Sequence, residues 1–356
     1  MTDKLPFDMS VIAQVLGIPY GKFYRWIKDS ISDFKDQETQ EKLHQNDIPS
    51  LHGDLDKIVK VPIFRQDQIG ESMAIDEKHL NGRFHTVLTN SKTSKVALLC
   101  SSIHPIDLQK CFEKFDGLGQ IKFITRDLSA TFKKAANIHF PNAVHIADKF
   151  HIIRHAIDAV HSLRNRLKQQ ALKQQRIEQA RHDQNYKDLK NPDFIGPKMN
   201  IKKGYKAQRV ENGETLPELL TRSRFLCSIH AEKWNDYQQN RANILFKYYP
   251  QLEKVYDIIL QFRDWYKVKP TQYEPFLNDK ILGNWLDLAE MSNNMELKNF
   301  RKLIENHYDE ILNYHKHGHR TNAIAESINA KINNAKRKNR GTRDVDFFNL
   351  RLSYII

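Results

Sequence analysis

The chain has 356 residues, of which 40% are hydrophobic, enough to fill the cores of two or three domains. It carries 56 Lys and Arg against 43 Asp and Glu, and the resulting net charge of +13 favours a polyanionic partner such as DNA or RNA. Its three cysteines form no CxxC pair, and no apolar stretch has the length of a membrane span. The composition therefore predicts a folded cytoplasmic, nucleoid-associated protein and argues against a structural zinc site built of cysteines.

Residues 1–32 have the spacing of a DNA-binding helix-turn-helix. Ala13 is expected where two helices touch, and Gly17 would open the turn four residues later. Pro19 suits the first turn of the second helix, where its missing N–H needs no partner. The apolar residues expected to pin the helices together are Ile12, Leu16, Ile18, Phe23 and Trp26. The side chains that the second helix would turn to a DNA groove are Tyr20, Lys22 and Arg25. The alternative is an ordinary helical hairpin.

After a polar segment expected as a linker (33–70), the pattern changes to that of a mixed α/β domain. Three short strands in hairpin order span 72–76, 83–90 and 94–100, with an Asn81-Gly82 turn between the first two. A helix (104–117), a strand (121–125), a helix (128–140), a strand (143–147) and a long helix from 149 follow. This order is that of the ribonuclease-H-like fold.

A long helical region and two basic clusters complete the chain. The core is expected to run over 71–170, to be interrupted by an all-helical insertion at 171–315, and to resume at 316–356 with a terminal helix over 322–338. Residues 161–210 hold 13 Lys and Arg against 4 Asp and Glu. The second cluster, at 331–340, includes the expected DNA contacts Lys336, Arg337 and Lys338. For each cluster the alternative is a solvated helix face.

Acidic residues at the ends of the predicted strands suggest a metal site. The first and fourth strands are neighbours in such a sheet, so Asp76 and Asp127 would come within reach of a shared ion, whereas Asp148 follows the fifth strand, further from the centre. Glu326 is the best candidate for a third acid, with an exposed helical glutamate as the alternative. Oxygen ligands favour Mg²⁺ or Mn²⁺, and two such ions would suit phosphoryl transfer.

Two further residues lie near these aspartates in the sequence. Glu77 would alternate to the opposite side of its strand from Asp76, which favours a supporting or structural role. His151 follows Asp148 by three residues. It could orient a carboxylate, bind phosphate, or pack near the start of the helix.

Three segments together resemble the DDE transposases of bacterial insertion sequences, specifically the ISL3 family. They are AIDEKHLNGRFHTVLTN, then TRDLSATFKKAANIHFPNAVHIADKFHIIRHAIDAVHSLRNRLK, and RTNAIAESINAKINNAKRKNRGTRDVDFFNLRLSYI. The resemblance implies that Asp76, Asp127 and Glu326 form the DDE triad, and that Asp148 and His151 form an accessory Asp-x-x-His element. Members often carry a cysteine-rich zinc-binding region ahead of the helix-turn-helix, whereas this sequence starts at the latter.

The resemblance also implies the reaction and the partners. Metal-dependent hydrolysis at the ends of the element would yield a 3′-hydroxyl, which then attacks target DNA, without a nucleotide cofactor. The partners would be the terminal inverted repeats and the target DNA, bound by a homodimer or larger assembly. A non-catalytic DNA-binding protein, such as a degenerate transposase copy, and a ribonuclease-H-like nuclease that cuts with water alone remain as alternatives.

Overall fold

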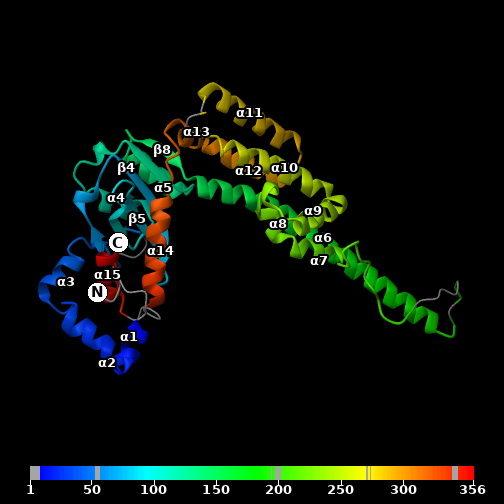
Figure 1. Cartoon of the computed structure of the whole chain (residues 1–356), viewed down its shortest axis with the longest axis horizontal. Helices are drawn as coiled ribbons and strands as arrows, with labels where there is room; N and C mark the ends of the chain where they lie inside the picture. Colours follow the sequence, from blue (N-terminus) through cyan, green and yellow to red (C-terminus); the bar gives the residue numbers. More distant parts are fainter. Residues whose placement is uncertain are drawn as a thin grey trace. The chain divides into compact units, whose positions relative to one another are not determined.

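The structure is a computed structural model that describes residues 9–52, 57–193, 195–196, 202–269, 272, 274–338 and 344–356. The chain divides into two compact units (Figure 1). The first combines Met1–His151 with His307–Ile356, and the second is Ile152–Asn306. A segment from each end of the sequence therefore builds the first unit.

A six-stranded mixed sheet forms the centre of the first unit, with the strand order β3-β6-β5-β4-β7-β8. The strands are β3 (Ile63–Phe64), β4 (Ser72–Leu80), β5 (Arg83–Asn90), β6 (Lys95–Cys100), β7 (Phe123–Arg126) and β8 (Val144–Ala147). β4, β5 and β6 are antiparallel, whereas β7 and β8 run parallel to β4. The predicted order of three hairpin strands followed by alternating helices and strands is confirmed.

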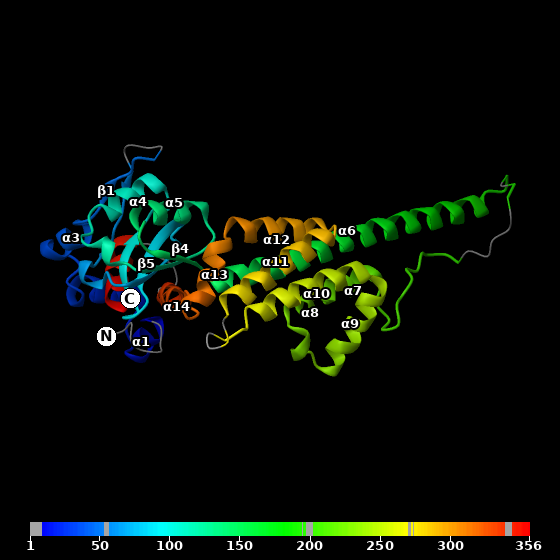
Figure 2. The same cartoon turned by 90° about the horizontal axis from the view of Figure 1, so that it is seen from above.

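Helices cover both faces of this sheet (Figures 1 and 2). On one face, α4 (Pro105–Phe112) and α5 (Ala130–His139) bury Phe112 and Phe132 against Ile75 and Leu88. On the other, α14 (Ala323–Lys338) and α15 (Val345–Ile355) pack Ile328, Ile332, Phe348 and Leu352 against Val87 and Leu99. Because side chains alternate along a strand, neighbouring residues of β4 serve opposite faces, and Asp76 lies on the α14 side.

Two short helices, α1 (Met9–Val15) and α2 (Tyr20–Trp26), meet around Ala13 and Phe23, which are 1% and 2% exposed. Gly17 adopts a positive φ of 67° in the turn between them, a conformation that glycine accepts at little cost. The prediction that Leu16 and Trp26 pin the helices was wrong, since they are 54% and 49% exposed. Pro19 was expected in the first turn of the second helix. It occupies the N-cap position of α2, one residue before that turn.

The expected linker at 33–70 contributes to the core of the first unit. It forms α3 (Gln37–His44), the paired strands β1 (Ile48–Pro49) and β2 (Ile58–Val59), β3, and the 3₁₀ turn η3 (Gln66–Gln68). Ile48, Val59 and Val61 are buried in the main apolar cluster. β3 pairs with β6 and so extends the sheet by one edge strand. Each of these strands has two residues, too few to show an alternating pattern.

The C-terminal segment of the chain packs against the N-terminal segment. α14 was expected to be the last helix, but α15 follows it. The Phe347 ring of α15 makes edge contacts with Tyr24 and Phe34, at centroid distances of 5.6 and 5.3 Å. Lys28, in the π-helical turn η2 (Ile27–Ile31), forms an ion pair with Asp344 at the start of α15. These contacts tie the two ends of the sequence together.

All the regular secondary structure described in the second unit is helical, as the sequence predicted, and residues 202–215 form a non-helical connection. The unit contains most of α6 (Lys149–Lys190), then α7 (Leu216–Arg222), α8 (Arg224–Ser228), η5 (Ala231–Lys233), α9 (Asp236–Tyr248), α10 (Pro250–Trp265), α11 (Pro275–Met291) and α12 (Met295–Asn306). An aromatic cluster of Phe262, Trp285 and Phe300 joins α10, α11 and α12. No helix in the described part of the chain is long and apolar enough to cross a membrane.

Candidate active site

Three aspartates stand in one row at the same edge of the sheet. In the parallel part of the sheet, Ile75 of β4 pairs with Arg126 of β7, which pairs in turn with Ala147 of β8. The next residue on each strand is an aspartate: Asp76, Asp127 and Asp148. Neighbouring strands lie about 4.8 Å apart, so Asp127 is in the middle with one aspartate on either side. The predicted neighbourhood of Asp76 and Asp127 therefore follows from the observed register.

All three aspartates are buried, with exposed fractions of 5%, 8% and 1% for Asp76, Asp127 and Asp148. Burial disfavours their charged forms and raises the pKa of Asp76 from 3.8 to about 6. Burial likewise raises the pKa of Asp127 and of Asp148. The His151 imidazole opposes this rise at all three carboxyls. A row of buried like charges is costly unless a cation balances it.

Backbone groups and a buried arginine fix the segment around Asp127. The Ser129 N–H donates to Asp127 Oδ1 at 2.9 Å, and the Arg126 guanidinium donates to the Asp127 carbonyl oxygen at 2.9 Å. The Arg126 side chain is fully buried and lies 2.5 Å from the carboxylate of Glu310, on α13 (Tyr308–Lys316). This ion pair ties the end of β7 to α13.

Two further basic side chains contact the Glu310 carboxylate. His307 Nδ1 lies 2.5 Å from Glu310 Oε2, and Lys133 Nζ lies 3.3 Å from Oε1. Burial alone would raise the pKa of Glu310, but the contacts with His307, Arg126 and Lys133 prevail and lower it to about 2. Glu310 is therefore a carboxylate at neutral pH and balances the buried charge of Arg126. The sequence gave no signal for this pair, which joins residues 184 positions apart.

Asp148 keeps one oxygen without a hydrogen bond. The Asn322 N–H donates to Asp148 Oδ1 at 3.3 Å, whereas Oδ2 is buried and has no hydrogen-bond partner among the described residues. His151 Nε2 is 3.8 Å from Oδ2, too far for a hydrogen bond. The amide side chain of Asn322 is also buried, at 1% exposed, and its oxygen and nitrogen make no hydrogen bond within the described structure. Such groups are usually satisfied by water or an ion.

Helix α14 crosses the aspartate row, and it carries a contact that the sequence analysis missed. Asn329 Nδ2 donates to Asp76 Oδ2 at 2.7 Å. Asn322 and Asn329 are seven residues apart, or about 10.5 Å of helix, close to the two strand spacings that separate Asp148 from Asp76. Glu326, four residues after Asn322 and three before Asn329, falls on the same face. The helical spacing of three and four residues from Glu326 could have identified Asn329 and Asn322 in the sequence as neighbours of the site.

Glu326 lies at the beginning of α14, as predicted, and is exposed. Partial burial raises its pKa, the Asp148 charge raises it further, and His151 lowers it. In this structure Asp148 and His151 are therefore the neighbouring side chains that act on the pKa of Glu326. The carboxylate oxygens of Asp76, Asp127 and Glu326 are not all within 4.8 Å of one another. Among the described residues, one set of three potential metal ligands meets that distance, and it lies in the second unit.

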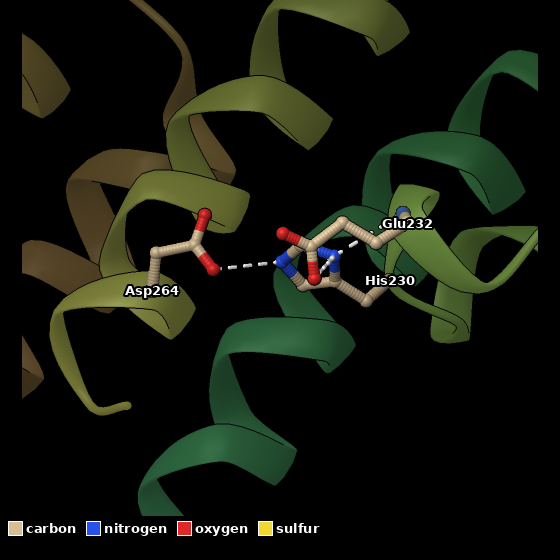
Figure 3. Close-up of side chains that lie close together, drawn as sticks. All are labelled: His230, Glu232 and Asp264. Atoms are coloured by element: carbon tan, nitrogen blue, oxygen red, sulfur yellow. Dashed lines mark hydrogen bonds and ion pairs between the residues drawn. The ribbon is translucent and has the colours of Figure 1, made fainter. Parts of the chain in front are cut away.

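That other set consists of His230, Glu232 and Asp264 in the second unit (Figure 3). His230 Nε2 lies 2.9 Å from Asp264, and its Nδ1 accepts the Glu232 N–H at 3.4 Å. Lys267 Nζ lies 3.0 Å from His230, 3.0 Å from Glu232 and 2.7 Å from Asp264. An ammonium group therefore stands where a metal ion would bind, and both imidazole nitrogens are used. We interpret the set as an ion-pair network.

The side chains expected to contact DNA differ in their surroundings. Lys22 and Arg25 of α2 are exposed. Tyr20 is half-buried and packs against the cluster that contains Tyr24, with ring centroids 6.1 Å apart. The basic residues Lys336, Arg337 and Lys338 form the last turn of α14, where positive charge also suits the helix dipole.

Residues 73–352 match the family model DDE_Tnp_ISL3, described as a transposase. The chain belongs to the ISL3 transposase family. The match begins at the start of β4 and ends within α15, so it includes the aspartate row and α14. The match confirms the family resemblance that the sequence motifs of this chain indicated. Searches of curated proteins and of solved structures gave no match.

Proposed function

We propose that this ISL3 transposase cleaves DNA at the ends of an insertion sequence and joins the freed 3′-hydroxyl to target DNA. Asp76, Asp127 and Glu326 are the triad that carries the reaction. One observation supports this assignment above others: Asp76 within β4 and Asp127 directly after β7 stand side by side in the register of two adjacent parallel strands, and the helix of Glu326 contacts Asp76.

The residues at this edge fit Mg²⁺ or Mn²⁺. The side chains offer carboxylate and amide oxygens without a cysteine, which is the ligand chemistry these ions prefer. The buried oxygen of Asp148 that has no hydrogen-bond partner among the described residues is a further sign that the edge accommodates a ligand. Asp76, Asp127 and Glu326 would hold the ions. Two divalent ions would activate the attacking oxygen and stabilise the leaving one.

The protein groups around the triad have supporting roles. Asn329 holds the Asp76 carboxylate through its side-chain amide, and the Arg126–Glu310 pair holds the backbone of Asp127. Fixed ligands of this kind favour in-line attack because little reorganisation is needed at the moment of reaction. Asp148 and His151 form the accessory element beside the triad.

The proposed function extends to the domains and the partners. The ribonuclease-H-like core consists of residues 71–170 and 316–356, with the helical insertion at 171–315 between these two parts, the connecting segment at 33–70 before them, and the helix-turn-helix at 1–32. Lys22 and Arg25 contact DNA bases or phosphates, and the basic end of α14 contacts phosphates. A homodimer or larger assembly would hold two DNA ends. The alternative of a DNA-binding protein without catalysis is an outcome of the tests below.

The assignment of the triad can be tested with labelled DNA that carries the genomic flanks of the gene. We expect Mg²⁺-dependent cleavage by the wild-type chain, loss of cleavage in Asp127→Asn, and residual cleavage in Asp148→Asn. Both substitutions keep the shape of the side chain and remove one charge, so each is a matched control for the other. Equal loss in both variants, or greater loss in Asp148→Asn, would contradict the choice of Asp127 over Asp148.

A further inference from the structure

A cavity of about 440 Å³ lies within the second unit, far along the sequence from the triad. This volume falls in the range of roughly 300–1,000 Å³ that is common for ligand sites. One wall is a stripe of α6 that includes Leu167, Gln170 and Gln174, spaced by three and four residues. The other walls are the segment 205–210, the start of α7, and the junction of α9 and α10.

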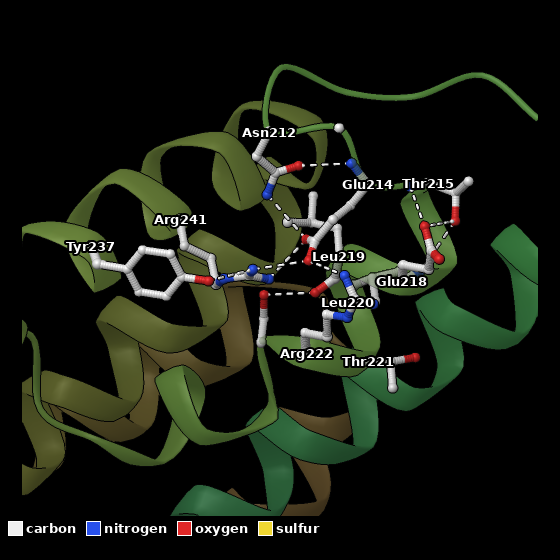
Figure 4. Close-up of polar contacts among 12 residues, drawn as sticks. Asn212, Glu214, Thr215, Glu218, Leu219, Leu220, Thr221, Arg222, Tyr237 and Arg241 are labelled. Carbon is white, nitrogen blue, oxygen red and sulfur yellow. Dashed lines mark hydrogen bonds and ion pairs between the residues drawn. The ribbon is translucent and has the colours of Figure 1, made fainter.

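A buried ion-pair network stabilises the wall formed by residues 210–217 (Figure 4). Glu214 is 6% exposed and accepts hydrogen bonds from Arg241 Nη1 and Nη2 at 2.8 and 2.9 Å and from Arg222 Nη1 at 2.8 Å. Thr215, the next residue, forms a capping box with Glu218 at the start of α7. The wall is therefore fixed before any ligand arrives, which lowers the entropic cost of binding.

The lining is rich in two kinds of side chain, glutamine amides and tyrosine rings. The glutamines are Gln170, Gln174, Gln175, Gln208 and Gln251. Three tyrosines, Tyr205, Tyr248 and Tyr249, share the lining with them. An amide offers a donor and an acceptor side by side, which matches the edge of a nucleobase, and an aromatic ring can stack on its face.

The charges of the lining residues indicate which part of a nucleotide the cavity can bind. Among the described residues no Lys or Arg lines it, and the one charged lining residue in that part of the chain is Glu178, whose carboxylate oxygens accept hydrogen bonds from Gln174 and Tyr205. A phosphate would be repelled there, whereas a base can donate to a carboxylate. The exposed cations Lys173 and Lys206 are next in sequence to lining residues. They are available for a backbone phosphate outside the cavity.

We propose that this cavity binds an unpaired base of a single-stranded segment of DNA. This proposal rests on the proposed function, since DNA is the partner that would deliver such a base. A base in a duplex has its edge occupied by its complement and its faces stacked, so only an unpaired base can enter. The same chemistry would also suit a free nucleoside, and the experiment includes that source.

The probe is a short single-stranded oligonucleotide with one 2-aminopurine, titrated with the full chain in EDTA so that no cleavage takes place. We expect binding to quench the 2-aminopurine fluorescence through stacking on Tyr248. Gln174→Leu and Tyr248→Ala should each raise the Kd by about 5-fold or more, the range that one base contact supplies. Tyr248→Phe keeps the ring and should keep the quenching.

Gln184→Leu is a matched control for Gln174→Leu. Both glutamines are exposed on α6, and each donates to an acidic residue one turn later, Gln174 to Glu178 and Gln184 to Asp188. We expect Gln184→Leu to bind as the wild-type chain does. The fluorescence assay does not depend on cleavage, so it can succeed in a chain that does not cut DNA, and it can fail in one that does.

Three results would overturn the proposal. In the first, Gln174→Leu and Tyr248→Ala bind the oligonucleotide as tightly as the wild-type chain. In the second, an oligonucleotide with an abasic residue in place of 2-aminopurine binds equally well. In the third, free adenosine displaces the probe at concentrations comparable with the oligonucleotide, which would assign the cavity to a free nucleoside.

Discussion

Replacing Asp76 with asparagine should stabilise the metal-free protein at neutral pH. Asp76 is 5% exposed, and burial raises its pKa from 3.8 to about 6, so its charged form is disfavoured in the folded state. A difference of one pKa unit corresponds to about 1.4 kcal/mol, which makes the cost of ionising Asp76 about 3 kcal/mol as an upper bound. Asp76→Asn removes this cost. The Asn329 amide can rotate and offer its oxygen, which has no hydrogen-bond partner in the described part of the chain, to the new side chain.

The stability that Asp76→Asn adds should increase with pH. As the pH falls below the unfolded pKa of 3.8, the carboxyl becomes protonated in both the folded and the unfolded state, so the stabilities of wild type and variant should converge. Between pH 4 and 6 the folded state binds more protons than the unfolded state, so the wild-type chain loses stability as the pH rises. The difference should be complete above pH about 6.

The free energy of unfolding can be measured by hydrogen exchange of the β4 and β5 amides in increasing urea, in EDTA, at pH 4 and at pH 7.5. The exposed Asp287 of α11 gives the matched control Asp287→Asn, which should change stability by less than about 0.5 kcal/mol at either pH. Mg²⁺ should then stabilise the wild-type chain and not Asp76→Asn, because only the former retains the ligand. Equal stability of wild type and Asp76→Asn at pH 7.5 would refute the reasoning.

The remaining predictions concern the residues that hold the aspartates. Asn329→Leu leaves Asp76 Oδ2 without its donor, so the Mg²⁺ concentration for half-maximal cleavage should rise, whereas the exposed Asn333→Leu on the same helix should leave it unchanged. Glu310→Gln leaves Arg126 charged and buried, and should destabilise the first unit by about 3 kcal/mol in urea at pH 7. Because the pKa of Glu310 is lowered to about 2, the wild-type advantage should be lost as the pH falls from about 4.5 towards 2; an unchanged advantage at pH 2 would contradict this.

The sequence predicted the sheet well because its strands have clear patterns. The short apolar segments of β4 and β5, the Asn81-Gly82 turn between them, and the apolar runs of β7 and β8 are local signals. The order of these elements then placed Asp76 and Asp127 on neighbouring strands, which the register bears out. Helix α14 was also recognisable from its apolar spacing.

The contacts that hold the site were not predictable in the same way. Asn329, Glu310 and Arg126 act through contacts between residues far apart in the sequence, and no local pattern marks such a partner. The pattern around Leu16 and Trp26 was misleading, because two helices of seven residues cover only part of their own apolar surface. The strands at 33–70 were too short to alternate. Glu214 was missed because it sits in a turn without a regular pattern.

Strand joining by the wild-type chain tests the central claim most directly. A labelled duplex with the element's own end is incubated with the chain, Mg²⁺ and an unlabelled plasmid, and Glu326→Gln serves as the comparison. The proposed function predicts that the label moves covalently into the plasmid with the wild-type chain and not with Glu326→Gln. Binding of the duplex without cleavage or joining would contradict it and would favour a DNA-binding protein without catalysis.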